Sequence, residues 1–338
     1  MKSVLFIGNI QYGEEPTGGG VQCKNQILLN YLEGKYVVDF VDTWGCSSVH
    51  SLLKSLYKIV TKKCDYIVLS IGMKGCSYIL KLLSIGRINL PPVYYFVPGG
   101  TFCRNLPRLK YADELMKIDK IFVQSKKQVI QSGNFGFHNV YYCPNFKDVL
   151  KIRENCDKTK LKETDIIRFV YIGRLVEEKG IEDIISANNI LINRNISNYE
   201  IVIYGESTEK YNADSFSKFN NIIFKGFLNL TNRKSYDELS KCSVLVFPSY
   251  FIGEGFPGTI IDAFICGMPV IATRHNVNEE IVNESNGLLV NVNSPKEIAD
   301  AMELLITNKK ILYSKSENAF QTALIYDTNN VLNKIFEV

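Results

Sequence analysis

Residues 251–269 combine a glycine-rich loop with two carboxylates, a set of residue types suited to binding a phosphorylated sugar. The loop follows the apolar run 243–249 and leads into a predicted helix, because Pro257 suits a first helical turn. Backbone N–H groups at a helix start attract anions, and glycine lets a phosphate approach the backbone closely. With Glu254 and Asp262 beside that start, the stretch is typical of a nucleotide-sugar site.

Two cations form a second candidate group. Arg174 and Lys179 lie five residues apart, on the loop between the apolar run 167–172 and the next predicted helix. A guanidinium offers a planar fork and an ammonium a point charge, so the two could converge on a diphosphate. Surface loops commonly carry such residues as ordinary solvated charges. The second glycine-rich loop, at 251–258, favours the diphosphate interpretation.

A first glycine loop, residues 12–20, follows the first predicted strand and ends in Gly18, Gly19 and Gly20. It lacks both the Gly-Lys-Ser/Thr ending of a P-loop and the G-x-G-x-x-G spacing of a dinucleotide site. Neither ATP nor NAD is therefore expected there. Contact with phosphate or substrate, and a purely flexible turn, both remain open interpretations.

The composition indicates a two-domain protein. The chain has 338 residues, 46% of them hydrophobic, and no apolar run long enough to span a membrane. Its nine cysteines form no C-x-x-C pair, so we expect reduced thiols and a cytoplasmic protein. A net charge of +4 without an arginine-rich tract argues against nucleic acid as a partner but permits anionic lipid or phosphorylated substrates.

The pattern of apolar runs predicts an α/β fold with two doubly wound parallel sheets. The first domain is expected over residues 1–146, a linker over 147–165, and the second domain over 166–319. The C-terminal helix, about 320–338, is a candidate to pack back on the first domain. Ligands of open α/β sheets bind at the carboxyl ends of the strands, so the two domains are expected to face a central cleft.

The individual elements follow from the same pattern. Strands are predicted over residues 3–7, 37–41, 66–70, 92–97, 120–124, 140–143, 167–172, 200–204, 221–224, 243–249, 269–273 and 287–290. Helices are predicted over residues 21–32, 49–62, 181–194, 233–241, 295–307 and 312–336.

Four motifs, in order, carry a resemblance to a known family. They are the glycine loop at 18–20, the Gly173-Arg174 and Lys179-Gly180 pair, the stretch 225–228, and Glu254 with Asp262 at an E-x7-E spacing. The sequence resembles retaining glycosyltransferases of the GT-B fold, in glycosyltransferase family 4, and most strongly from residue 168 to 290.

The resemblance implies a role for each charged residue. Arg174 and Lys179 would bind the donor diphosphate, Glu254 the donor sugar and Asp262 the ribose hydroxyls. Arg174, Lys179 and Glu254 are the expected catalytic residues. The other expected donor-binding residues are Gly19, Gly20, Gly173, Gly205, Leu228, Gly255, Phe256, Pro257, Gly258 and Thr259.

The sequence departs from the family pattern in two places. Asp262 stands where relatives carry a glutamate, so its carboxylate is one methylene shorter but can still accept bonds from a ribose diol. The region 96–102 has no histidine, which many relatives use on the acceptor side. Gly99, Gly100 and Thr101 are the expected acceptor-side residues instead.

Cofactor and partners follow from the same resemblance. No D-x-D motif is evident, so we expect metal-independent catalysis and no cofactor. The expected partners are a UDP- or GDP-sugar and a glycan acceptor, with a polyprenyl-diphosphate-linked glycan of bacterial surface polysaccharide synthesis as the candidate. Peripheral contact with the inner face of the membrane is expected from the aromatic and basic residues of the first domain. The candidates for that face are Tyr94, Tyr95, Phe96, Phe102, Arg104, Arg108 and Lys110.

Two other functions fit the pattern. A GT-B nucleotide-sugar 2-epimerase would share the two domains but needs acid and base residues at the sugar, and histidines are scarce. A catalytically inactive nucleotide-sugar-binding protein is the other alternative, although all four charged positions are present.

Overall fold

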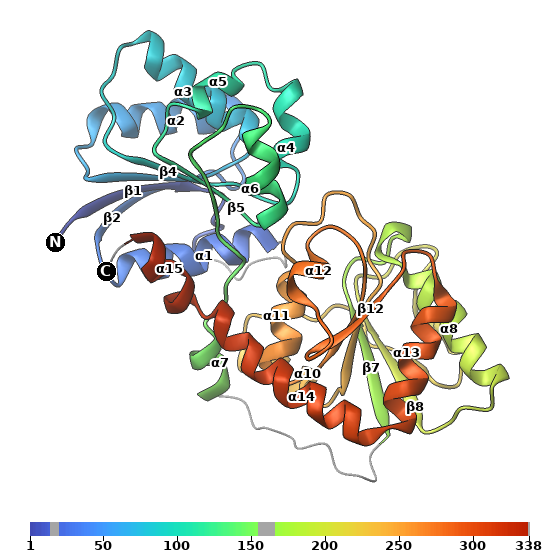
Figure 1. The fold of residues 1–338 in the computed structure, drawn as a ribbon. Helices are drawn as coiled ribbons and strands as arrows, with labels where there is room; N and C mark the ends of the chain where they lie inside the picture. Colours follow the sequence, from blue (N-terminus) through green and yellow to red (C-terminus); the bar gives the residue numbers. More distant parts are fainter. Residues whose placement is uncertain (14–19, 155–165, 337–338) are drawn as a thin grey trace. The chain divides into compact units, whose positions relative to one another are not determined.

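The chain divides into two compact units in the computed structural model, which describes residues 1–13, 20–154 and 166–336. Figure 1 colours both units by sequence. The first unit comprises Met1–Asn145 with Gly253–Phe256, and the second comprises Phe146–Ile252 with Pro257–Val338. The division falls one residue before the expected boundary at 146. The C-terminal segment, a candidate for packing on the first domain, groups with the second unit.

A six-stranded parallel sheet forms the centre of the first unit, in the order β2-β1-β3-β4-β5-β6. Its strands are β1 (Ser3–Gly8), β2 (Val37–Asp42), β3 (Tyr66–Ser70), β4 (Val93–Phe96), β5 (Lys120–Val123) and β6 (Val140–Tyr142). Residue Val4 of β1 pairs with Val38 on one side and Tyr66 on the other. The order reverses between β1 and β3, which is the arrangement of a doubly wound fold. The predicted parallel sheet is confirmed.

Helices cover both faces of this sheet, which explains why β1 is buried from Val4 to Ile7. They are α1 (Gly20–Glu33), α2 (Ser48–Thr61), α3 (Met73–Ile85), α4 (Phe102–Asn105), η1 (Leu106–Arg108), α5 (Ala112–Leu115) and α6 (Lys126–Gly133). Figure 1 shows α2 and α3 together over one face and α1 on the other. Leu5, Ile7 and Leu69 point into the hydrophobic core beneath α3.

Polar side chains fix the loop that follows β1. The Asp42 carboxylate, at the end of β2, accepts backbone N–H groups of Ile10 and Tyr12 at 2.9 and 2.8 Å. From α1, the Asn25 amide donates to the Asn9 carbonyl at 2.9 Å and accepts from the Ser70 hydroxyl at 2.6 Å. The carboxyl ends of β1 and β3 are thereby tied together. Of the predicted glycine loop, Gly20 begins α1 and is exposed, whereas Gly19 lies outside the described residues.

The second unit is built on another six-stranded parallel sheet, in the order β12-β11-β10-β7-β8-β9. Its strands are β7 (Ile167–Ile172), β8 (Tyr199–Tyr204), β9 (Ile222–Phe224), β10 (Val244–Phe247), β11 (Val270–Thr273) and β12 (Gly287–Val290). Its helices are α7 (Val149–Glu154), η2 (Glu177–Lys179), α8 (Ile181–Asn193), α9 (Ala213–Ser217), α10 (Arg233–Leu239), α11 (Gly258–Ile265), α12 (Asn278–Ile281), α13 (Pro295–Thr307), α14 (Lys309–Ala323), η3 (Leu324–Tyr326) and α15 (Thr328–Phe336). The strand order reverses between β7 and β10, where such folds bind ligands.

The C-terminal helix differs from its prediction. A single helix was expected over residues 312–336, but the chain leaves the helix at η3 and re-enters it at α15. At the break, the backbone N–H of Lys147 donates to the Tyr326 carbonyl at 3.0 Å, and the Thr328 N–H donates to the Lys147 carbonyl at 2.9 Å. Backbone groups that pair with Lys147 cannot also continue a helix, so a distant segment of the chain sets the break.

The predicted linker also differs, because its first part forms α7. Val149 is fully buried, and the Arg153 guanidinium carbon lies 3.4 Å from the centroid of the Phe320 ring. The same guanidinium donates to the Phe264 carbonyl at 3.5 Å, at the end of α11. Burial lowers the pKa of Arg153 to about 10. The polar composition predicted a solvated segment, but α7 packs against α11 and α14 through these two side chains.

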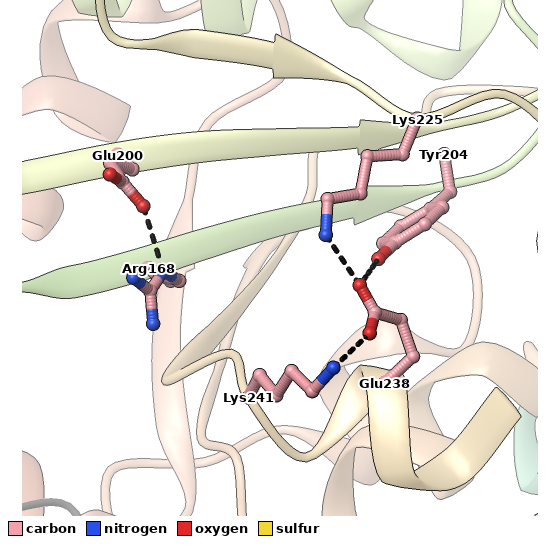
Figure 2. Close-up of polar contacts among 6 residues, drawn as sticks. All are labelled: Arg168, Glu200, Tyr204, Lys225, Glu238 and Lys241. Atoms are coloured by element: carbon pink, nitrogen blue, oxygen red, sulfur yellow. Dashed lines mark hydrogen bonds and ion pairs between the residues drawn. The ribbon is translucent and has the colours of Figure 1, made fainter. Parts of the chain in front are cut away.

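A network around Glu238, near the end of α10, joins the carboxyl ends of β8 and β9 (Figure 2). The Glu238 carboxylate accepts the Tyr204 hydroxyl at 3.1 Å, forms an ion pair with Lys225, and lies 2.5 Å from Lys241 Nζ. The hydrogen bonds from Lys225 and Lys241 lower the pKa of Glu238 from 4.5 to about 2. Tyr204 directly precedes Gly205, and Lys225 is the first residue of the stretch 225–228. The network therefore holds the beginnings of two predicted donor-side segments in place.

Among the described residues, none of the helices has both the length and the apolar character needed to pass through a membrane.

Replacing Glu238 with glutamine should reduce stability in a pH-dependent way. Folding lowers the Glu238 pKa, so its contribution is complete above pH 4.5 and is lost as the pH falls toward 2. Since its lysine partners are substantially exposed, we expect a loss of about 1 kcal/mol at pH 7, or roughly 3 °C in Tm. Thermal unfolding from pH 7 to pH 2.5 tests this, with Glu209→Gln as an exposed control. A Glu238→Gln deficit that stays constant below pH 4 would contradict the assignment.

Candidate functional site

Arg174 and Lys179 converge on one aromatic ring in the second unit. The guanidinium carbon of Arg174 lies 5.1 Å from the centroid of the Phe251 ring, and Lys179 Nζ lies 5.4 Å from the same centroid. Lys179 Nζ is also 5.7 Å from the Phe247 ring. A ring attracts a cation through its quadrupole but carries no net charge. The two cations therefore create positive potential at one place, suited to a diphosphate.

Backbone contacts hold these cations in place. The Tyr171 hydroxyl, at the end of β7, donates to the Arg174 carbonyl at 2.6 Å. On the other side of the loop, the Tyr250 N–H donates to the Glu178 carbonyl at 2.8 Å, which pins η2 against the segment after β10. Gly180 has φ of 75°, and a Cβ there would lie 2.5 Å from the Pro248 carbonyl oxygen. Only glycine fits that position, so Gly180 is needed for the close approach of the two loops.

The neighbouring glycines Gly173 and Gly205 pack backbone against backbone. A Cβ on Gly205 would lie 2.5 Å from the Gly173 carbonyl oxygen and 2.8 Å from Leu175 Cγ. The Gly205 N–H donates to the Gly226 carbonyl at 2.9 Å, two residues before the half-buried Leu228. The ends of β7, β8 and β9 thus carry three of the predicted donor-side positions on one edge of the sheet.

The predicted helix is confirmed as α11, but it begins at Gly258, so Pro257 is its N-cap residue rather than a residue of the first helical turn. Thr259 in its first turn is half-buried, and every later residue of the helix is buried. The helix ends before Gly267, whose φ of 71° suits the left-handed conformation that closes many helices. Its N-terminus follows β10 directly, on the same sheet edge as Arg174.

Asp262 is buried in the middle of α11 and already has two partners. The Tyr236 hydroxyl of α10 donates to its Oδ1 at 2.5 Å, and Lys147 Nζ lies 3.1 Å from the same oxygen. The side chains of Asp262 and Lys147 are only 5% and 13% exposed. The carboxylate therefore serves as the charge partner of a buried lysine, a role that the ribose assignment did not anticipate.

Glu254 groups with the first unit, together with Gly255 and Phe256. The Phe256 N–H donates to Gln124 Oε1 at 3.0 Å, and its carbonyl accepts the Asn145 side-chain amide at 3.2 Å. Gln124 directly follows β5, so this short segment lies at the carboxyl end of the first sheet.

The predicted acceptor-side residues Gly99 and Gly100 lie against the backbone of Glu254 and Gly255. A Cβ on Gly100 would lie 2.1 Å from the Glu254 carbonyl oxygen, and one on Gly255 would lie 3.0 Å from the Gly99 backbone. Thr101 accepts the Asn105 side-chain amide at 2.9 Å. Close backbone approach thus accounts for Gly100 and Gly255 as glycines, whether or not a substrate binds beside them.

The aromatic residues expected to face a membrane are mostly in the core. Tyr95, Phe96 and Phe102 are buried, because β4 is covered on both faces and Phe102 begins α4 beneath α6. The expected lipid-facing surface at residues 94–110 is therefore wrong for these three side chains.

Four residues that no sequence motif had indicated contact candidate residues within their own units: Phe251, Tyr236 and Lys147 in the second unit and Gln124 in the first. Phe251 stood inside the glycine-rich stretch, so its proximity to Arg174 could have been suspected. Lys147 and Tyr236 lie 115 and 26 residues from Asp262 along the chain, and no local pattern connects them.

Comparisons with known proteins support the resemblance. The chain is 27% identical over 222 residues to the capsular polysaccharide biosynthesis glycosyltransferase CapM of Staphylococcus aureus, covering 60% of this chain and 54% of CapM. It is 30% identical over 101 residues to the N,N'-diacetylbacillosaminyl-diphospho-undecaprenol alpha-1,3-N-acetylgalactosaminyltransferase of Campylobacter jejuni, covering 30% and 26% of the two chains. The chain spans about half or less of the length of the curated relatives it matches.

Among solved structures, Anabaena Alr3699/HepE in complex with UDP and glucose has a TM-score of 0.72 at 16% identity, covering 100% of this chain and 99% of that one. This likeness confirms the GT-B fold of two Rossmann-like units. A model of the family described as glycosyl transferases group 1 matches residues 152–322, just over half of the chain. That stretch contains Arg174, Lys179, Glu254 and Asp262, and the chain belongs to the glycosyl transferases group 1 family.

Proposed function

We propose that this glycosyltransferase moves a sugar, with retention, from a UDP- or GDP-sugar to a glycan acceptor without a metal ion. The convergence of Arg174 and Lys179 on the Phe251 ring is the observation that carries the proposal. It supplies two cations at the point of the second sheet where ligands of such folds bind. The similarity to CapM and to the Campylobacter enzyme supports a polysaccharide or lipid-linked glycan as the acceptor.

The proposed chemistry follows from where charge develops. As the bond between the anomeric carbon and the diphosphate oxygen breaks, negative charge grows on the leaving diphosphate and positive charge on the sugar ring. Arg174 and Lys179 would stabilise the leaving group more in the transition state than in the ground state. The acceptor oxygen forms the new bond on the same face, and its proton passes to the leaving diphosphate. Glu254 would contact the donor sugar during this step.

Arg174→Ala should lower kcat by roughly a hundredfold, because one preorganised charge on the leaving group is lost. Arg174→Lys should lose less, since it keeps a point charge but not the planar fork. Glu254→Ala should also lower kcat strongly. Arg168→Ala is the matched control, because Arg168 lies at the opposite end of β7 and pairs with Glu200. The measurement is transfer from a panel of UDP- and GDP-sugars to a polyprenyl-diphosphate-linked sugar, and wild-type rates in both site variants would refute the assignment.

Transfer should continue in EDTA at near the untreated rate. The protein's own cations would take the place of Mg²⁺ on the diphosphate, and no D-x-D motif is evident in the sequence. The measurement compares initial rates with EDTA, with added Mg²⁺, and with neither. A complete loss in EDTA that Mg²⁺ restores would show that transfer needs a metal.

The role of Asp262 can be separated from its structural contacts. Asp262→Asn alone leaves the buried Lys147 charge without its ion-pair partner. We therefore expect the free energy of unfolding to fall by about 3–5 kcal/mol, or Tm to fall by on the order of 10 °C. The double variant Asp262→Asn with Lys147→Met removes both charges and should recover most of that stability. If Asp262 also holds the ribose, the double variant still shows a raised KM for the donor. A stable double variant with wild-type KM would reduce Asp262 to a structural residue.

A further inference from the structure

Helix α2 carries a stripe of exposed apolar side chains. Val49, Leu53, Tyr57 and Val60 are 66%, 61%, 67% and 57% exposed, respectively. Their spacing of four, four and three residues places them on one face of the helix. Single exposed apolar residues are ordinary on a protein surface, but a continuous stripe of four marks an interaction surface.

The core does not account for this stripe. On the face of α2 that meets the first unit, Ser55 and Ile59 are buried, and Leu52 and Leu56 pack partly against the core. Figure 1 shows α2 beside α3 over one face of the first sheet. The apolar arc of the helix therefore continues past Leu52 and Leu56 onto the solvent side, where Leu53 and its neighbours stand exposed.

Positive charge lies along one side of the stripe, away from Leu52 and Leu56. Between residues 48 and 63 the chain has four lysines and no aspartate or glutamate. Lys54 and Lys63 are exposed, whereas Lys58 and the exposed Lys62 form ion pairs with Asp39 at 2.8 and 3.4 Å. The single tryptophan of the chain, Trp44, is 40% exposed in the loop that leads into α2.

We propose that α2 is a docking surface for an anionic lipid bilayer. The four apolar side chains enter the headgroup region while the lysine side chains reach lipid phosphates, and the helix lies in the plane of the interface. Tryptophan and tyrosine favour that depth because one end of each ring is polar; Tyr57 belongs to the stripe, and Trp44 lies in the loop before α2.

A second copy of the chain fits this surface less well. In a symmetric dimer the same face meets itself, which would bring the lysines of one α2 toward those of the other. Like charges oppose such a contact, whereas an anionic bilayer attracts the exposed lysines. The charge pattern of α2 thus favours an anionic bilayer over a second copy of the chain.

This docking surface deepens the proposed transfer to a lipid-linked acceptor. It would bring the first unit to the surface on which such an acceptor is displayed. Vesicle binding is measured without any sugar substrate, so failure of the docking surface and failure of the proposed transfer are distinguishable.

The test is co-sedimentation of the full chain with vesicles of phosphatidylcholine containing 30% phosphatidylglycerol, against pure phosphatidylcholine. We expect binding to the anionic vesicles that weakens with salt. Leu53→Gln with Tyr57→Gln should lower the apparent affinity at least tenfold. Lys54→Glu with Lys63→Glu should lower it about thirtyfold or more.

Matched controls distinguish α2 from any exposed residue of the same type. Ile130→Gln on α6 removes a side chain that is 76% exposed in the same unit, and Lys296→Glu with Lys310→Glu reverses two exposed charges on α13 and α14. Both controls should sediment like the wild type, and every variant should keep the wild-type Tm and the thermal shift with UDP.

Three outcomes would overturn the proposal: no wild-type binding to anionic vesicles, equal loss in the controls, or unchanged binding in the α2 variants. A lipid-free dimer that the Leu53 and Tyr57 changes convert to monomer would assign the stripe to a second copy instead. Size-exclusion chromatography of the same samples reports that result.

Discussion

The pairing of β7 with β10 is the constraint on which the second unit's candidate site depends. These strands are neighbours, with Val244 opposite Phe169, although β8 and β9 lie between them in sequence. The loops that follow the two strands therefore begin side by side. Gly180 can approach Pro248 only because glycine has no side chain. Arg174, Lys179 and Phe251 meet as a consequence of backbone topology, before any ligand is considered. A cation pair assembled in this way is preorganised, which is what stabilisation of a leaving diphosphate requires.

The charges of the second unit are placed in two contrasting environments. Arg174 is exposed over an aromatic ring, where it can respond to an anion, whereas Asp262 is buried against Lys147 and Tyr236. The short side chain of Asp262 keeps its carboxylate close to the backbone of α11. There it contacts Lys147 and the Tyr236 hydroxyl, which come from other segments of the chain. Such a buried pair costs desolvation but fixes orientation. Asp262 thus provides a structural connection between α11, α10 and the chain at Lys147.

Sequence patterns predicted many of the elements that local chemistry determines, although α3 was not among the predicted helices, and they did not reveal elements that depend on distant partners. The bounds of β7, β12 and α13 match their predictions, because each is a clear apolar run or periodic stretch with Gly or Pro at its start or end. The break near Asp327 was missed, since it depends on Lys147 backbone groups 180 residues away. The helix α7 was missed because the polar composition of its segment predicted a solvated linker. Its residues Val149 and Arg153 instead pack on α11 and α14. For the same reason Arg174 and Lys179 were found from the sequence, whereas Lys147 was not.

The first unit shows why apolar content alone does not identify a surface. Tyr95, Phe96 and Phe102 are aromatic, yet a parallel sheet covered on both faces encloses them. In α2 the opposite holds, since a helix on the outer layer can bury only the arc that faces the sheet. Ile59 lies in that arc and is buried, whereas the apolar residues Val49, Leu53, Tyr57 and Val60 lie outside it and are exposed. The exposed residues therefore became recognisable only once the sheet order had fixed which side of α2 is covered.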